Sequence, residues 1–214
     1  MAVRLVVFDL DGTLVDSSRD LATALNAALV RLAPGTPRLS DERVRSFIGS
    51  GARKLIERSL LASSLELPVE ELLPAFLEAY RGCLLDTTRL YPGVEEALEA
   101  LAPRALAVLT NKPGDLSRAI LEGLGVAGRF LRVYGGGDLP ERKPDPVGLL
   151  RLLEEAGAAA SEAVMVGDSD IDVLTGRAAG ALTAGVSYGF DPGSLRATPP
   201  DVMLDDLREL AGRL

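Results

Sequence analysis

Short apolar stretches alternate with longer amphipathic ones along most of this chain, which is the pattern of strands followed by helices. Residues 3–10 are almost continuously apolar, as expected of a strand buried on both faces of a sheet. Shorter apolar runs predict further strands at residues 105–109, 132–134, 163–166, 181–186 and 202–204. This alternation predicts an α/β fold, in which helices cover both faces of a parallel sheet.

Helices are predicted where apolar residues recur three or four positions apart. The first helix starts at Asp16 and Ser17, and one face of it carries Leu21, Leu25, Ala28, Leu29 and Leu32. Further helices are expected around residues 55–60, 72–84, 94–101, 116–124, 146–156 and 170–179. For the helix that begins at Pro146, Asp145 is the predicted N-cap.

The segment that follows the first strand contains helical patterns and no convincing strand until about residue 86. Its length of about 70 residues is that of a small domain and not of a loop. We therefore predict a helical domain at residues 16–88, inserted into an α/β core formed by residues 1–15 and 89–214. The two crossings between these parts, near Val15 and near Leu90, would be the hinges.

Composition excludes several classes of function. A net charge of −8 without a basic tract argues against nucleic acid as a partner. No apolar run reaches the roughly 20 residues of a membrane helix, and Asp9 interrupts the N-terminal run, so no anchor or signal peptide is expected. A single cysteine is consistent with the cytoplasm. The absence of histidine rules out a Ser-His-Asp triad and a His-ligated zinc site.

Candidate chemistry begins where the first strand ends, in the sequence FDLDGTL at residues 8–14. Asp9 and Asp11 stand one residue apart, and Gly12 allows a sharp turn directly after them. Two carboxylates this close repel each other unless a cation compensates their charge, and Mg²⁺ prefers oxygen ligands beside phosphates. An Asx-type turn without any ligand is the alternative interpretation.

Two further polar groups follow later strands. Thr110 and Asn111 come directly after residues 105–109, where they could bind an anionic oxygen or simply form a turn. Lys143 lies just before the helix that begins at Pro146. A single lysine is usually a solvated surface residue, although the prolines that follow Lys143 stiffen its backbone.

The fourth polar group is GDSDID at residues 167–172, after the strand at residues 163–166. A capping box between Ser169 and Asp172, at the start of a helix, would account for Asp172 and Asp170 but not for Asp168. Because the carboxyl ends of parallel strands share one edge of a sheet, all four groups should converge on one crevice. Acids for a metal, beside hydroxyl and ammonium groups for an anion, are the composition of a phosphoryl-transfer site.

These motifs resemble, in residue type and in order, those of the haloacid dehalogenase superfamily in its phosphatase branch. They are DLDGT at residues 9–13, Thr110-Asn111, Lys143-Pro144 and GDSDID at residues 167–172. The resemblance covers essentially the whole chain and implies a Rossmann-like parallel sheet core with an inserted all-helical cap domain. It also implies Mg²⁺-dependent hydrolysis of a small phosphorylated metabolite in the cytoplasm.

The resemblance also assigns roles to the motif residues. It makes Asp9 the nucleophile that forms an aspartyl-phosphate and Asp11 the general acid and base. Asp9, Asp168 and the backbone carbonyl of Asp11 would hold Mg²⁺, with Asp172 outside the ligand shell. The groups expected to bind the phosphoryl oxygens are those of Thr13, Thr110, Asn111 and Lys143.

Within this branch the chain is most similar to phosphoglycolate phosphatases, through IGSGAR at residues 48–53, YPG at 91–93 and TNKP at 110–113. Ser50 stands where the cap loop of those enzymes commonly has asparagine. Arg53 and Lys54 follow this loop and either bind a substrate carboxylate or are solvated helix residues. Pyrophosphate, sugar phosphates, nucleotides and a phosphomutase reaction remain alternatives, and the oligomeric state is not predicted.

Rival interpretations rest on fewer residues. Cys83 and Arg89 have the C-x5-R spacing of cysteine-dependent phosphatases, but the intervening residues include an acid and no glycine. A phospho-accepting receiver domain also combines early acids with a later Thr and Lys, but it would lack the helical insertion and Asp168. A dehalogenase is disfavoured by the second acid, Asp11, and a protein without activity by the presence of every motif residue.

Overall fold

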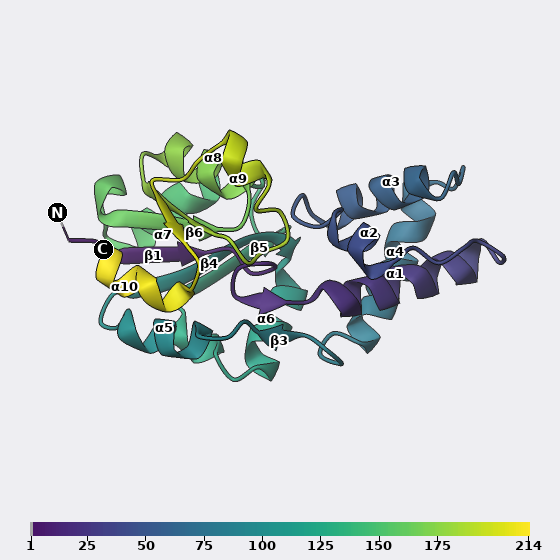
Figure 1. Cartoon of the computed structure of the whole chain (residues 1–214), viewed down its shortest axis with the longest axis horizontal. Coiled ribbons are helices and arrows are strands. Elements are labelled where there is room, and N and C mark those ends of the chain that lie inside the picture. The colour runs from purple at the N-terminus through teal and green to yellow at the C-terminus, as the bar shows by residue number, and fades with distance from the viewer. Residues whose placement is uncertain (1) are drawn as a thin grey trace.

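The structure is a computed structural model that describes residues 2–214 and consists of two parts (Figure 1). One part is a six-stranded parallel sheet with helices on both faces, and the other is a group of four helices that extends from it. This confirms the predicted α/β fold with an inserted helical segment. No helix among residues 2–214 is both long enough and apolar enough to cross a membrane.

The sheet places its first strand in the middle, in the order β5-β4-β1-β6-β7-β8. Its strands are β1 (Leu5–Phe8), β4 (Ala105–Pro113), β5 (Arg132–Gly136), β6 (Ala163–Gly167), β7 (Leu182–Val186) and β8 (Val202–Leu204). From β1 the chain builds one half of the sheet through β4 and β5, and then returns to β6 on the other side. The carboxyl ends of β1, β4 and β6 therefore meet at the reversal, where α/β sheets bind ligands.

Strand β1 is buried on both faces, which explains its unbroken apolar sequence. Val6 and Phe8 belong to the apolar cluster beneath α5 (Val94–Ala100) and α6 (Gly114–Gly123), whereas Leu5 and Val7 belong to the cluster beneath α7. The remaining helices of this part are α7 (Val147–Ala156), α8 (Asp170–Ala179), α9 (Ser194–Ala197) and α10 (Leu210–Arg213), with 3-10 turns at Ala127–Arg129, Ala160–Glu162 and Leu207–Glu209.

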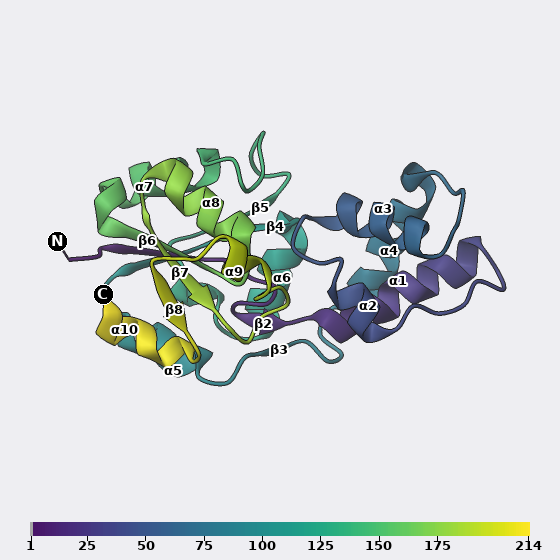
Figure 2. The same cartoon turned by 45° about the horizontal axis from the view of Figure 1, so that its top comes forward.

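The four inserted helices, which we call the cap, pack around an apolar cluster of their own (Figures 1 and 2). They are α1 (Ser18–Leu32), α2 (Asp41–Arg45), α3 (Ala52–Ala62) and α4 (Val69–Gly82). The predicted apolar face of α1 lies in this cluster, with Leu32 only partly buried. The chain enters and leaves the cap through an antiparallel pair of two-residue strands, β2 (Val15–Asp16) and β3 (Arg89–Leu90).

Several element boundaries differ from the prediction. The first strand is shorter than residues 3–10, whereas β4 runs beyond Leu109 to Pro113, with a register shift against β5. Strands β2 and β3 and the helices α2, α9 and α10 were not predicted, because two to five residues are too few to show periodicity. Helix α7 begins at Val147, so Asp145 is not its N-cap, although its carboxylate accepts the Val147 N–H at 2.9 Å.

Candidate active site

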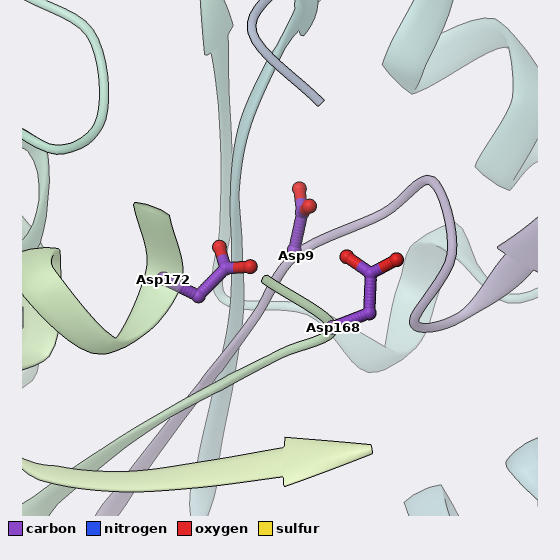
Figure 3. Close-up of side chains that lie close together, drawn as sticks. All are labelled: Asp9, Asp168 and Asp172. Carbon is purple, nitrogen blue, oxygen red and sulfur yellow. The ribbon is translucent and has the colours of Figure 1, made fainter. Parts of the chain in front are cut away.

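Three buried aspartates converge at the carboxyl edge of the sheet (Figure 3). Asp9 follows β1, Asp168 follows β6, and Asp172 lies in the first turn of α8. One carboxylate oxygen from each lies within 4.8 Å of the others. The topology therefore brings Asp9 and Asp168 together as expected, and it adds the carboxylate of Asp172, which was predicted outside the ligand shell.

Burial and the mutual repulsion of these acids raise the pKa values of Asp168 and Asp9. Burial raises the pKa of Asp168 to about 8, with the negative charges of Asp172 and Asp9 adding to the effect. Burial also raises the pKa of Asp9 to about 6, although the ammonium of Lys143 opposes the increase. The donor set contains only oxygen atoms and carries excess negative charge, so a hard divalent cation fits it.

Lys143 supplies the one ammonium group that touches this acidic cluster among the described residues. Its Nζ lies 2.6 Å from Asp172 Oδ1 and 2.9 Å from Asp9 Oδ1, and the side chain is almost completely buried. Burial acts to lower the pKa of Lys143, but the carboxylates of Asp172 and Asp9 outweigh it and hold the pKa above its usual range. The interpretation of Lys143 as a solvated surface lysine is therefore wrong.

The backbone around the acids is shaped to let them approach. Gly12 has a φ of +86°, and a Cβ at this position would overlap the carboxylate of Asp168. The same carboxylate accepts the backbone N–H of Phe190. The predicted capping box is confirmed, because the backbone N–H and the hydroxyl of Ser169 donate to Asp172 Oδ2 at 3.2 and 2.8 Å. Asp172 thus caps the start of helix α8 and also belongs to the acidic cluster.

The residues predicted to bind phosphoryl oxygens lie beside the acids. Thr110 is buried and lines a cavity together with Asp9. The hydroxyl of Thr13 is buried and has no hydrogen-bond partner among residues 2–214. The side chain of Asn111 instead connects two loops, since its Nδ2 donates to the backbone carbonyls of Lys143 at 3.0 Å and Gly49 at 3.2 Å. Both hydrogens of the Asn111 side-chain amide are therefore engaged, so this side chain has no donor left for a phosphoryl oxygen.

Asp11 points away from the acidic cluster and towards the cap. Its carboxylate accepts the Ser17 hydroxyl at 2.6 Å and lies 3.0 and 3.1 Å from Lys112 Nζ. Lys112 Nζ also donates to the Tyr80 hydroxyl of α4 at 2.6 Å. No role was predicted for Lys112 within TNKP, and Tyr80 lies within the helix predicted at residues 72–84. A lysine next to a motif residue at a strand end was the available clue.

Asp11 lines two cavities. The inner cavity, about 40 Å³, lies between the sheet edge and the cap. Its lining consists of Asp9, Asp11, Leu21, Ile48, Gly49, Gly51, Ala52, Leu55, Phe76, Leu77, Tyr80, Thr110, Lys112, Pro113 and Leu116. The outer cavity, about 300 Å³, is lined by Asp11, Ser46, Ile48, Gly49, Ser50, Arg58, Asp168, Ser169, Asp170, Ile171, Phe190 and Asp191.

The structure does not bring the predicted cap cations to either cavity. Arg53 forms an exposed ion pair with Glu70 at 3.0 Å, and Lys54 forms one with Glu57 at 2.6 Å. Neither side chain is among those that line the two cavities. A substrate carboxylate inside the inner cavity would therefore meet neither of them in this arrangement.

The rival cysteine chemistry is not supported. Cys83 follows α4, and its thiol faces the carbonyls of Asp20 and Ala79 at 3.6 and 3.5 Å. Burial raises the pKa of this thiol, and the nearby charge of Asp20 adds to the increase. The Arg89 guanidinium is occupied by backbone carbonyls, including that of Thr88 at 2.6 Å. This is the environment of an inert thiol and not of a nucleophile.

Comparison with known proteins agrees with this geometry. A family model described as haloacid dehalogenase-like hydrolase matches residues 6–186. A protein of Vibrio parahaemolyticus named phosphoglycolate phosphatase is 42% identical over 97% of this chain and 94% of its own length. One of the same name from Pseudomonas fluorescens is 39% identical, over 97% and 78%. A crystal structure of a predicted phosphoglycolate phosphatase from Haemophilus somnus has a TM-score of 0.92 at 34% identity, covering 99% of this chain and 97% of that one.

Proposed function

The chain belongs to the haloacid dehalogenase-like hydrolases and is a phosphatase, and from this we propose that it hydrolyses 2-phosphoglycolate with Mg²⁺ through an aspartyl-phosphate on Asp9. The observation that carries the proposal is the position of Asp9. Its carboxylate belongs to the acidic cluster, contacts Lys143 and also lines the inner cavity with Asp11 and Thr110. A nucleophile, a proton carrier and phosphate-binding groups thus share one site.

The reaction would proceed in two displacements. In the first, an oxygen of Asp9 attacks phosphorus, the bond from phosphorus to the leaving oxygen breaks, and Asp11 gives its proton to that oxygen. In the second, Asp11 takes a proton from water, whose oxygen attacks phosphorus and releases inorganic phosphate. The Asp9 carboxylate is then restored. Both aspartates line the inner cavity, which supports a reaction in which they act on the same substrate.

The acidic cluster would hold the metal. Asp9, Asp168 and the backbone carbonyl of Asp11 are the proposed ligands, and the proximity of Asp172 makes its carboxylate a further candidate. Bound Mg²⁺ supplies positive charge that offsets the repulsion between the phosphate and the attacking carboxylate. Lys143 adds a buried positive charge in contact with Asp9, where it would stabilise the phosphoryl oxygens in the transition state.

The choice of substrate rests on the relatives. Proteins that match nearly the whole chain carry the name phosphoglycolate phosphatase. Ser50, which stands in place of the asparagine expected in the cap loop, lines the outer cavity and is not part of the lining of the inner one.

A phosphate-release assay tests the proposal directly. The purified protein is incubated with 2-phosphoglycolate, pyrophosphate, a sugar phosphate, a nucleotide and ethyl phosphate, with Mg²⁺ or with chelator. We expect the highest kcat/KM for 2-phosphoglycolate and no activity in chelator. Asp9→Asn should lower kcat by at least about a thousandfold, as expected when the covalent step is removed. Retention of a tenth of the activity by this variant would exclude Asp9 as the nucleophile.

A further inference from the structure

Lys112 is a buried cation that lines the inner cavity, and it takes no part in the two displacements of the proposed reaction. Its ammonium lies 3.0 Å from Asp11 Oδ2, donates to the Tyr80 hydroxyl at 2.6 Å and stands 4.5 Å from the centre of the Tyr80 ring. The ammonium is buried, forms an ion pair with the Asp11 carboxylate and lines the inner cavity. A buried cation therefore faces the space between core and cap.

The lining of the inner cavity has only one source of positive charge. Among the described residues that form it, Lys112 is the one cation, and the cap contributes mostly apolar groups such as Leu55, Phe76 and Leu77. Asp9 and Asp11 are the acids of the same lining. An anion that enters a cavity of this kind is strongly disfavoured unless a buried cation pairs with it.

The outer cavity offers a poorer environment for a carboxylate. Its cation, Arg58, already donates to the Phe47 carbonyl at 2.9 Å and to the Ser50 hydroxyl at 3.1 Å. Four aspartates line the same cavity, namely Asp11, Asp168, Asp170 and Asp191. Repulsion from these acids would oppose the binding of an anionic leaving group there.

From this arrangement we infer that Lys112 determines substrate specificity. When the substrate binds, the Lys112 ammonium leaves the Asp11 carboxylate and contacts the carboxylate of the leaving group instead. The inference rests on the proposed hydrolysis of phosphomonoesters and names the residue that selects among them. Tyr80 holds the ammonium from the cap side, so the exchange needs only a local movement of the Lys112 side chain. The substrate class is a phosphomonoester with a short leaving group that ends in a carboxylate.

The exchange also connects recognition with chemistry. While Lys112 holds the Asp11 carboxylate, that group points towards the cap and the Ser17 hydroxyl. A substrate carboxylate that takes over the ammonium would release Asp11 to turn towards the leaving oxygen. A neutral ester of the same length provides no such competitor, so it should react less efficiently even where it fits the cavity.

The test compares 2-phosphoglycolate with ethyl phosphate, which has the same two carbons and no carboxylate. The wild-type protein should prefer 2-phosphoglycolate in kcat/KM. In Lys112→Met, and in the polar variant Lys112→Gln, this preference should fall by about 10–100-fold, the range for loss of a charge-assisted contact. Arg31→Met is the matched control, because Arg31 forms an exposed ion pair with Glu78 and neither side chain lines the inner cavity.

Binding measurements keep the inference testable if the Lys112 variants lose all turnover. In an Asp9→Asn background with Mg²⁺, calorimetry gives the dissociation constants of 2-phosphoglycolate and ethyl phosphate. The ratio of the ethyl phosphate constant to the 2-phosphoglycolate constant should fall by a similar factor when Lys112 is replaced by Met. An unchanged preference in the Lys112 variants, or its loss in Arg53→Met instead, would overturn the inference and leave the phosphatase assignment intact. A wild-type protein that does not prefer 2-phosphoglycolate would overturn both the proposed substrate and this inference.

Discussion

The ammonium of Lys143 lies 2.6 Å from the Asp172 carboxylate and 2.9 Å from that of Asp9, and all three side chains are buried. One positive charge therefore stands between two of the three acids that form the cluster. Removal of one partner from a buried ion pair is strongly unfavourable, because the remaining charges lose their compensation and cannot reach water.

We predict that Lys143→Met lowers the free energy of unfolding by about 3–5 kcal/mol in chelator. It should also lower kcat at least about a hundredfold on anionic and neutral esters alike, because in the proposed mechanism the lost charge would face the phosphoryl group. Urea denaturation and phosphate release measure the two effects. Arg151→Met is the control, because Arg151 forms only exposed ion pairs on α7. Near-normal turnover in Lys143→Met would exclude a role in the transition state.

The raised pKa values of Asp168, about 8, and Asp9, about 6, predict a pH dependence of stability without metal. The ordinary value is 3.8, so between about pH 4 and 8 the folded protein keeps protons that the unfolded chain has released. The free energy of unfolding should consequently fall as the pH rises through this window. The proposed Mg²⁺ would bind the ionised carboxylates, so it should raise the melting temperature more near pH 8 than near pH 5.

Calorimetry with chelator or saturating Mg²⁺ at the two pH values measures this effect. Asp168→Asn removes the acid with the most strongly raised pKa and should remove most of the pH dependence in chelator. Asp41→Asn, at the exposed start of α2, should leave it unchanged. An equal Mg²⁺ effect at both pH values would contradict the metal site.

Asp20 of α1 joins the two crossings between core and cap. Its carboxylate accepts the hydroxyls of Thr87 and Thr88 at 2.6 and 2.7 Å, and their backbone N–H groups at 2.8 to 3.0 Å. Burial acts to raise the pKa of Asp20, but these hydrogen bonds outweigh it and lower the pKa. The stabilisation is therefore present above about pH 4 and is lost as the pH falls through the lowered value.

Asp20→Ala should lower the free energy of unfolding by about 2–4 kcal/mol at neutral pH, since it leaves buried donors without an acceptor. The deficit relative to wild type should shrink under acidic conditions, which is the opposite sign to that predicted for Asp168. Chemical denaturation at several pH values gives the comparison, with the exposed neighbour Asp86→Ala as control. A deficit independent of pH would show that packing and not the carboxylate is responsible.

The sequence predicted the residues whose position depends on the sheet alone. Asp9 and Asp168 are fixed by strand ends and by the order of strands, which follow from apolar periodicity and the rules for parallel sheets, and Lys143 lies in the loop between β5 and α7. The contact between Lys112 and Tyr80 depends instead on how the cap lies over the core. No local pattern encodes such a contact between distant elements.

The same limit explains why Arg53 was a candidate and Lys112 was not. Arg53 follows a glycine-rich loop, which is a local feature, but its side chain turns to Glu70 on α4. The two-residue strands β2 and β3 are likewise too short for periodicity, and they exist because Asp20 and the paired backbones hold the two crossings together.

Arg45 of the cap makes a direct contact with the loop that supports Asp168. Its guanidinium donates to the Gly189 carbonyl at 2.9 Å and stands 4.8 Å from the centre of the Phe190 ring. The backbone N–H of Phe190 in turn donates to the Asp168 carboxylate. The position of the cap over the core and the position of a proposed metal ligand are therefore stabilised by the same loop.

We predict that Arg45→Ala lowers kcat/KM about 5–30-fold, since a hydrogen bond and a cation–π contact together contribute about 1–2 kcal/mol to the contact between cap and core. The loss should be the same for 2-phosphoglycolate and ethyl phosphate, because Arg45 does not line the inner cavity. The Mg²⁺ concentration needed for half-maximal activity should rise as well. Arg43→Ala is the matched control, because Arg43 stacks on Phe47 within the cap. A loss confined to 2-phosphoglycolate would instead indicate that Arg45 recognises the substrate, and it would contradict a role of Arg45 in positioning the cap over the core.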